Sequence, residues 1–195
     1  MIDIKKLKEI YQFTKGFSFT DIRDLVKASK RKKFKKKDIL ININSTSNEV
    51  FMVLKGMVRC FRIDENGEDI TIALYPENYL VPNVDYVLCK DKSRSFYEAI
   101  EETVTLSMDL DAAMVIIERS NNLAVNSKFI YLKFMKRMYQ RIQSFVLLSP
   151  EKRYELFVKE NPSINTRVPD KYIANILGIT PVSLSRIRKR LSKNN

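Results

Sequence analysis

The chain has 195 residues, of which 45% are hydrophobic and 30% are charged, so it is long enough for one large or two small domains with buried cores. Its net charge of +12 favours an acidic partner such as nucleic acid. Since the chain has no histidine and only four glycines, without a phosphate-binding glycine loop, we expect neither an enzyme nor a bound metal or cofactor.

The two cysteines, Cys60 and Cys89, are too few for a disulfide framework and indicate a reducing compartment. We expect Cys60 to be buried in a strand, and Cys89 to be an ordinary surface thiol unless the neighbouring lysines lower its pKa. The N-terminus is charged and amphipathic, and no apolar stretch is long enough to cross a bilayer. These features predict a cytoplasmic protein that does not contact membranes.

The N-terminal part begins with two stretches of helical periodicity, Ile2–Phe13 and Thr20–Ala28, with a break at Gly16. The basic run Lys30–Lys37 follows, with the sequence KRKKFKKK. One interpretation is a contact with nucleic acid or membrane. The pattern favours the other, a solvated loop that leads into a strand and turns Phe34 inward.

From Asp38 the periodicity changes to alternation, which predicts strands. Asp64–Gly67 is the clearest hairpin turn, because Asn-Gly suits positive φ at both central positions. Pro76 and Pro82 limit regular structure, so Tyr79–Val84 is predicted to be a loop or a very short helix. Many short strands indicate a jelly-roll-like β-domain. The predicted strands are Ile39–Ile43, Glu49–Leu54, Met57–Ile63, Asp69–Leu74, Ser95–Ile100 and Val104–Leu110.

A short helix is predicted at Asp111–Glu118 and a long one at Leu123–Leu148. The long helix has a wide apolar face, which would cover either its own β-domain or a second helix. Because the face is longer than one small sheet usually covers, the pattern favours a homodimer. The residues that define the seam are Leu132, Met135, Tyr139, Ile142 and Val146, widened by Met138 and Phe145.

Another helix begins at Ser149-Pro150-Glu151, where Ser149 serves as cap and Pro150 takes the first helical position. It is expected to end near Asn161-Pro162. A short strand at Thr166–Val168 would then make the following motif a winged helix-turn-helix.

Two helices with a tight turn are predicted at the C-terminus. The first covers Lys171–Leu177 and ends at Gly178, and the second starts with Thr180 as cap and Pro181 at its first position. The second helix has an apolar face and a cationic face, which suits phosphate contact and base reading in the major groove. The alternative is a basic amphipathic helix that is merely solvated. The cationic face carries Val182, Ser185, Arg186 and Lys189.

The order of helix, β-unit, long helix and helix-turn-helix resembles the Crp/Fnr family of bacterial transcription regulators. The residues that carry this resemblance are IANILGITPVSLSRIRKRL at Ile173–Leu191, SPEKRYELF at Ser149–Phe157 and VFMVLKGMVRCFRIDENGEDITI at Val50–Ile72. The last stretch looks like the first half of a cyclic-nucleotide-binding roll.

The resemblance implies a role for each residue of the second helix that matches the family's motif. Arg186 matches the arginine that pairs with guanine O6 and N7. Thr180 and Ser183 match positions that hold phosphates, and Lys189 continues along the backbone. Family members usually have a glutamate where this chain has Val182, so one polar base contact is missing and Val182 could contact a thymine methyl instead.

The resemblance also implies where a cyclic nucleotide would bind. Family members that bind one hold its phosphate with a glycine–glutamate pair before a small helix and an arginine–serine pair about ten residues later. Here Tyr79–Leu88 has no Gly-Glu, Ser93 falls where the arginine is expected, and Arg94 lies one place along. In a strand that displacement turns Arg94 to the other face. A buried phosphate without its arginine lacks the positive charge that offsets the cost of its desolvation. We therefore expect either a small-molecule effector other than cAMP or no effector.

The sequence therefore predicts an α+β protein with a jelly-roll-like sensor domain at 1–120, a dimerisation helix at 121–148 and a winged helix-turn-helix at 149–195. We expect a homodimer that binds double-stranded DNA and regulates transcription. The alternative is a ligand-sensing or protein-interaction module of the same fold that no longer reads DNA.

Overall fold

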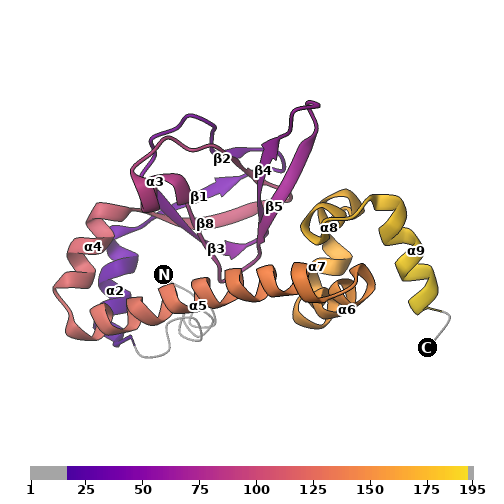
Figure 1. The fold of residues 1–195 in the computed structure, drawn as a ribbon. Coiled ribbons are helices and arrows are strands. Elements are labelled where there is room, and N and C mark those ends of the chain that lie inside the picture. The colour runs from indigo at the N-terminus through magenta and orange to yellow at the C-terminus, as the bar shows by residue number, and fades with distance from the viewer. Residues whose placement is uncertain (1–16, 193–195) are drawn as a thin grey trace. The chain divides into compact units, whose positions relative to one another are not determined.

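The computed structural model describes residues 17–192 and has an α+β fold, with two sheets, a long helix and a C-terminal group of helices (Figure 1). The chain forms two compact units: residues 1–61 and 74–133 make the first, and residues 62–73 and 134–195 make the second. The helix predicted at Ile2–Phe13 lies outside the described residues. No helix in the described range is long and apolar enough to cross a membrane.

The β-domain consists of two four-stranded sheets, with strand orders β1-β8-β3-β6 and β2-β7-β4-β5. Successive residues alternate in burial along β3, so Phe51 and Val53 are buried while Val50 and Met52 are half-buried. In the other sheet, Tyr97 of β7 is completely buried. The strands are β1 Lys30–Phe34, β2 Ile39–Ile41, β3 Glu49–Lys55, β4 Val58–Ile63, β5 Asp69–Tyr75, β6 Leu80–Pro82, β7 Phe96–Ala99 and β8 Thr103–Asp109.

The helices of the first unit include α2 Phe19–Ala28, α3 Val84–Cys89 and α4 Leu110–Glu118. Helix α2 begins with a capping box in which the Ser18 hydroxyl accepts from the Asp21 N–H and the Asp21 carboxylate accepts from the Ser18 N–H. The predicted helices at Thr20–Ala28 and Asp111–Glu118 are thus confirmed, each starting one residue earlier. Cys60 is buried, as expected, and Cys89 is exposed.

The prediction of a loop at Lys30–Lys37 is wrong for its first half, since Lys30–Phe34 is strand β1 and pairs antiparallel with β8. Phe34 does turn inward, where its ring meets that of Phe51 edge to face at 6.1 Å. The loop prediction for Tyr79–Val84 is wrong as well, because Leu80–Pro82 forms β6 beside β3. Both strands owe their structure to partners that are distant in the chain, not to local alternation.

The hairpin between β4 and β5 forms where it was predicted, but its turn differs. Of the two central residues only Gly67 has a positive φ, at 81°. The carboxylate of Asp64 accepts hydrogen bonds from the backbone N–H groups of Asn66 and Glu68, both at 2.9 Å. The aspartate side chain therefore organises this turn, as short polar side chains often do.

The second unit contains the C-terminal part of α5 Asn121–Leu147, followed by α6 Pro150–Glu160, α7 Pro162–Arg167, α8 Asp170–Leu177 and α9 Pro181–Leu191. The strand predicted at Thr166–Val168 is wrong, and no strand occurs in residues 134–192. Pro162 occupies the first helical position of α7, and Ile164 is buried, so a short helix forms where the wing was expected.

Candidate nucleic-acid interface

Helices α8 and α9 are joined by the sharp turn that the sequence predicted. Gly178 ends α8 with φ at 65°, and the Ile179 N–H donates back to the Ala174 carbonyl at 3.0 Å. The Thr180 hydroxyl then accepts from the Ser183 N–H at 3.1 Å, and Pro181 takes the first position of α9. Each turn residue therefore has the local role that its chemistry favours.

The two helices pack through small and branched side chains. Ile173 and Ala174 of α8 are completely buried, and so is Leu184 of α9, with Ile187 close to fully buried. Because Ala174 has only a methyl group, α9 can approach α8 closely. This packing fixes the direction in which the opposite face of α9 points.

The exposed side of α9 carries four of the six candidate DNA-binding residues, and the other two, Thr180 and Ser183, lie at the N-terminal end of the helix. Val182 is 60% exposed, Ser183 is half-buried, and Thr180, Ser185, Arg186 and Lys189 are exposed. Helix α9 contains four basic residues and no acidic residue. The surface is therefore positively charged and contains hydroxyl groups that can donate to phosphates.

Arg188 of α9 has a structural role, unlike the exposed Arg186. Its guanidinium donates to the Tyr154 hydroxyl at 3.0 Å, to the Asp170 carboxylate at 2.6 Å and to the side-chain amide oxygen of Asn165 at 3.1 Å. It thus links α6, α7 and α8 to α9. Helical spacing could have revealed this, because Arg188 follows the buried Leu184 by four residues.

Replacing Arg188 by alanine should destabilise the second unit by about 1–3 kcal/mol, because three polar groups lose their hydrogen bonds to the guanidinium and the Tyr154 hydroxyl is part-buried. Arg190→Ala is the matched control: Arg190 pairs with Glu151 at 3.3 Å and is largely exposed, so its loss should cost no more than about 0.5 kcal/mol. Urea denaturation of both variants measures the difference. Equal stabilities would contradict the role assigned to Arg188.

Gly178 also lies against the ring of Phe145 of α5, which in turn contacts Arg153 of α6. A Cβ atom at Gly178 would be 2.7 Å from Cε1 of Phe145. The Arg153 guanidinium stacks 4.9 Å from the centre of the same ring and donates to the carbonyls of Leu148 at 2.9 Å and Leu177 at 3.2 Å. A single arginine therefore caps the C-terminal ends of both α5 and α8.

Gly178→Ala should destabilise the protein by about 2–4 kcal/mol, because the left-handed backbone is unfavourable for alanine and the new methyl overlaps the Phe145 ring. The Gly67→Ala variant measures the backbone contribution alone. Gly67 also has a positive φ, at 81°, but a Cβ atom added there would have no contact within 4 Å. This substitution should cost only about 1 kcal/mol. Thermal denaturation of both variants tests this, and a Gly178 variant no less stable than the Gly67 variant would contradict the packing argument.

The hairpin between β4 and β5 contacts α8 within the second unit. The Lys171 ammonium pairs with the carboxylates of Asp69 and of Glu68, the latter at 3.1 Å. The Asn175 side-chain oxygen accepts from the Thr71 N–H at 3.1 Å. These contacts were not predictable from the sequence, because the partners are about a hundred positions apart.

Helix α5 carries the apolar seam that the sequence predicted, and in the single chain this seam is exposed. Ile142 is 61% exposed and Val146 is 75% exposed. Leu132, Met135 and Tyr139 are exposed as well. An exposed row of large apolar side chains on one long helix is typical of interaction surfaces.

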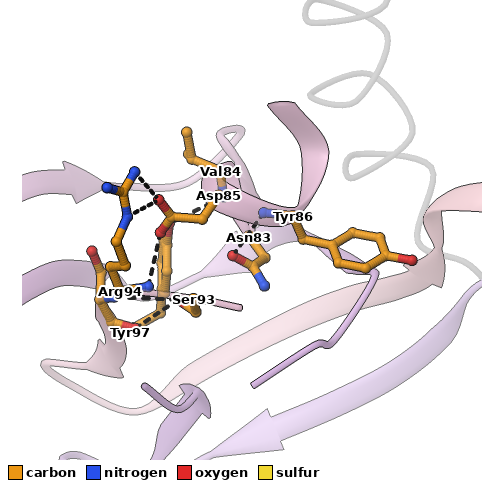
Figure 2. A network of polar contacts seen from close by, with 8 residues as sticks. Asn83, Val84, Asp85, Tyr86, Ser93, Arg94 and Tyr97 are labelled. Atoms are coloured by element: carbon orange, nitrogen blue, oxygen red, sulfur yellow. Dashed lines mark hydrogen bonds and ion pairs between the residues drawn. The ribbon is translucent and has the colours of Figure 1, made fainter. Parts of the chain in front are cut away.

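Polar side chains between Asn83 and Tyr97, a segment that includes Ser93 and Arg94, form a network among themselves (Figure 2). Ser93 and Ser95 are buried, whereas the Arg94 side chain is 68% exposed and pairs with Asp85. Arg94 therefore points away from the interior, as its displacement in the sequence predicted. The interior is occupied by Tyr97, whose hydroxyl accepts from the Val84 N–H at 3.4 Å.

The chain is similar to known proteins both in sequence and in fold. Residues 31–120 match the cyclic nucleotide-binding domain family. The global nitrogen regulator of Nostoc sp. (strain PCC 7120 / SAG 25.82 / UTEX 2576) is 26% identical over 155 residues, which cover 72% of this chain and 69% of the relative.

Solved structures with the same fold include FixK2 from Bradyrhizobium japonicum, with a TM-score of 0.71, 15% identity and 85% of each chain covered. A CooA mutant from Carboxydothermus hydrogenoformans has a TM-score of 0.69 and 20% identity, over 87% of this chain and 78% of the other. The catabolite activator protein of Thermus thermophilus has a TM-score of 0.58 and 17% identity, over 93% of this chain and 87% of the other. At these identities the structures show a common fold.

Proposed function

We propose that the chain is a transcription regulator of the Crp/Fnr family, which acts as a homodimer and binds double-stranded DNA sequence-specifically in the cytoplasm. The observation that carries this proposal is the exposed face of α9, which is cationic, free of acidic residues and oriented by a buried underside. We assign sensing to residues 1–120, pairing to residues 121–148 and DNA reading to residues 149–195.

In this proposal α9 enters the major groove with its N-terminal half toward the bases. Arg186 reads guanine through its planar fork, and Val182 and Ser185 lie on the same face. Thr180, Ser183 and Lys189 hold the backbone phosphates and so set the register of the helix. A valine in place of the family's usual glutamate changes one base contact, so the preferred operator should differ at that position.

Pairing of α5 with its copy would cover the exposed seam and place the two α9 helices on one side of the dimer. Two reading helices related by a two-fold axis require a palindromic operator, with half-sites about 34 Å, or one helical turn, apart. The exposed row of Leu132, Ile142 and Val146 supports this, because a solvated seam of that kind is unfavourable for a monomer.

Regulation would act through the corner at which α5 meets the reading helices. Arg153 caps both α5 and α8 there, so a rotation at residues 148–150 changes the direction of α9. We propose an effector other than cAMP, or none, because Arg94 points outward and is already paired with Asp85.

Selection of bound duplexes from a random DNA pool tests the proposal directly, using purified protein without ligand near physiological salt. Enrichment of a palindrome is expected. If the folded, dimeric protein enriches no sequence and its weak DNA binding barely depends on salt, DNA reading has been lost, because phosphate neutralisation must release counterions.

A further inference from the structure

The contact between Asp85 and Arg94 joins the first turn of α3 to the segment just before β7 (Figure 2). We propose that Arg94 forms a binding site for a small oxyanion, and that the chain fills this site with its own carboxylate, that of Asp85. The native protein then takes no external anion there. Without Asp85, the same site takes a carboxylate or a phosphate.

Three donors of one residue converge on this carboxylate. The Arg94 backbone N–H donates to Oδ2 at 2.9 Å, Nε donates to Oδ1 at 2.8 Å, and Nη2 lies 2.8 Å from Oδ1. Both carboxylate oxygens are therefore bound, one by the backbone and one by the guanidinium. A guanidinium and a backbone N–H on one oxyanion are the groups by which proteins bind free carboxylates and phosphates.

The burial of the two partners shows which of them is enclosed. Asp85 is only 7% exposed, whereas the Arg94 side chain is 68% exposed. In the exposed pair of Lys171 with Glu68, by contrast, the carboxylate is 64% exposed. Arg94 thus closes over a buried anion from the solvent side, and its hydrogen bonds to Asp85 raise the pKa of the Arg94 guanidinium.

Two neighbouring polar side chains, those of Asn83 and Tyr97, contribute no positive charge. The Asn83 amide donates to the carbonyls of Ser45 and Ser47, at 3.4 and 3.1 Å. Burial raises the pKa of the Tyr97 phenol far above its ordinary value, so this group stays neutral. An enclosed carboxylate needs compensation, and the arginine that faces it supplies the charge.

An intramolecular carboxylate has an advantage over any free anion, because the chain holds it at a high effective concentration. A free phosphate or carboxylate that displaced Asp85 would also leave a buried carboxylate without its cation. The site is therefore closed while Asp85 is present. Truncation of Asp85 leaves the Arg94 N–H and guanidinium without an acceptor, beside a space the size of a carboxylate.

Thermal denaturation of the full-length Asp85→Ala protein tests the proposal, with sodium formate compared against sodium chloride at equal ionic strength and neutral pH. Formate at about ten times its dissociation constant should raise the melting midpoint by about 3 °C or more above the chloride value. Inorganic phosphate should act in the same direction. The wild-type midpoint should be the same in formate and chloride.

Two variants make the test specific. Asp91→Ala removes an exposed acid from the same connection and should show no formate effect. The double variant Asp85→Ala with Arg94→Ala should show none either, because the donors are gone. If Asp85→Ala is unfolded in chloride, formate should restore its far-UV circular dichroism. An Asp85→Ala protein with equal midpoints in both salts, or unfolded in both, would overturn the proposal.

Discussion

Replacing Ile142 by glutamate should convert the protein to a monomer and weaken its binding to a palindromic duplex by about a hundredfold or more. Ile142 is 61% exposed in the single chain and lies in the middle of the α5 seam. In a symmetric pair each glutamate would be desolvated near its copy, where neither carboxylate has a partner. Loss of pairing makes the second half-site contact intermolecular, which accounts for the large effect.

The control for Ile142→Glu is Gln140→Glu, which adds the same charge to α5 two residues away but off the apolar seam. It should remain dimeric and bind DNA almost normally. Light scattering coupled to size exclusion measures the mass, and fluorescence anisotropy measures DNA binding. A dimeric Ile142→Glu protein with normal affinity would show that α5 does not form the interface.

Arg186→Ala should weaken binding to the selected duplex by about 1–3 kcal/mol, or roughly ten- to a hundredfold, and should relax the preference at one base pair. The expected cause is the loss of a bidentate contact, while the buried underside of α9, formed by Leu184 and Ile187, is untouched. Repeating the duplex selection with the variant identifies the relaxed position. An equal loss on selected and random DNA would contradict base reading by Arg186.

Lys189→Ala is the comparison for Arg186→Ala, since Lys189 is also exposed on α9 but is assigned to the phosphate backbone. This variant should bind all duplexes more weakly and reduce the slope of log affinity against log salt by about one. The two variants together separate sequence reading from phosphate contact.

The C-terminal pair of helices was predictable because its signals are local. Gly178, Thr180 and Pro181 each have a conformational preference that the turn uses directly. Strands β3, β4, β5, β7 and β8 were predictable for a similar reason, since short runs rich in β-branched and aromatic residues, separated by turn signals, are also local features.

The elements that sequence reasoning missed depend on distant partners. Strand β1 is almost entirely basic and is a strand because it pairs with β8, more than seventy residues later. The β6 strand ends at Pro82 and is held by β3. Helix α7 was missed for a different reason. Pro162 begins this helix and Ile164 is its buried residue, but the short run Thr166–Val168 looked like a strand when it was considered by itself.

At the candidate site, the exposure of the residues on α9 could be predicted from helical periodicity. The hydrogen-bond and ion-pair partners of the arginines could not. The contacts of Arg188 and the pairing of Asp85 with Arg94 join side chains on different elements. A single sequence carries no signal for such pairs. The displaced Arg94 could be recognised as unsuited to a buried phosphate, whereas its actual partner could not.

Strand β1 is the outermost strand of its sheet in the described part of the chain, so one row of its backbone groups is left without a neighbouring strand. Exposed edges of this kind readily pair with another copy and start aggregation. Lys30, Arg31 and Lys33 are exposed along this edge, and two such edges would repel each other. The basic run thus protects the solubility of the β-domain, and self-association through the sheet is disfavoured.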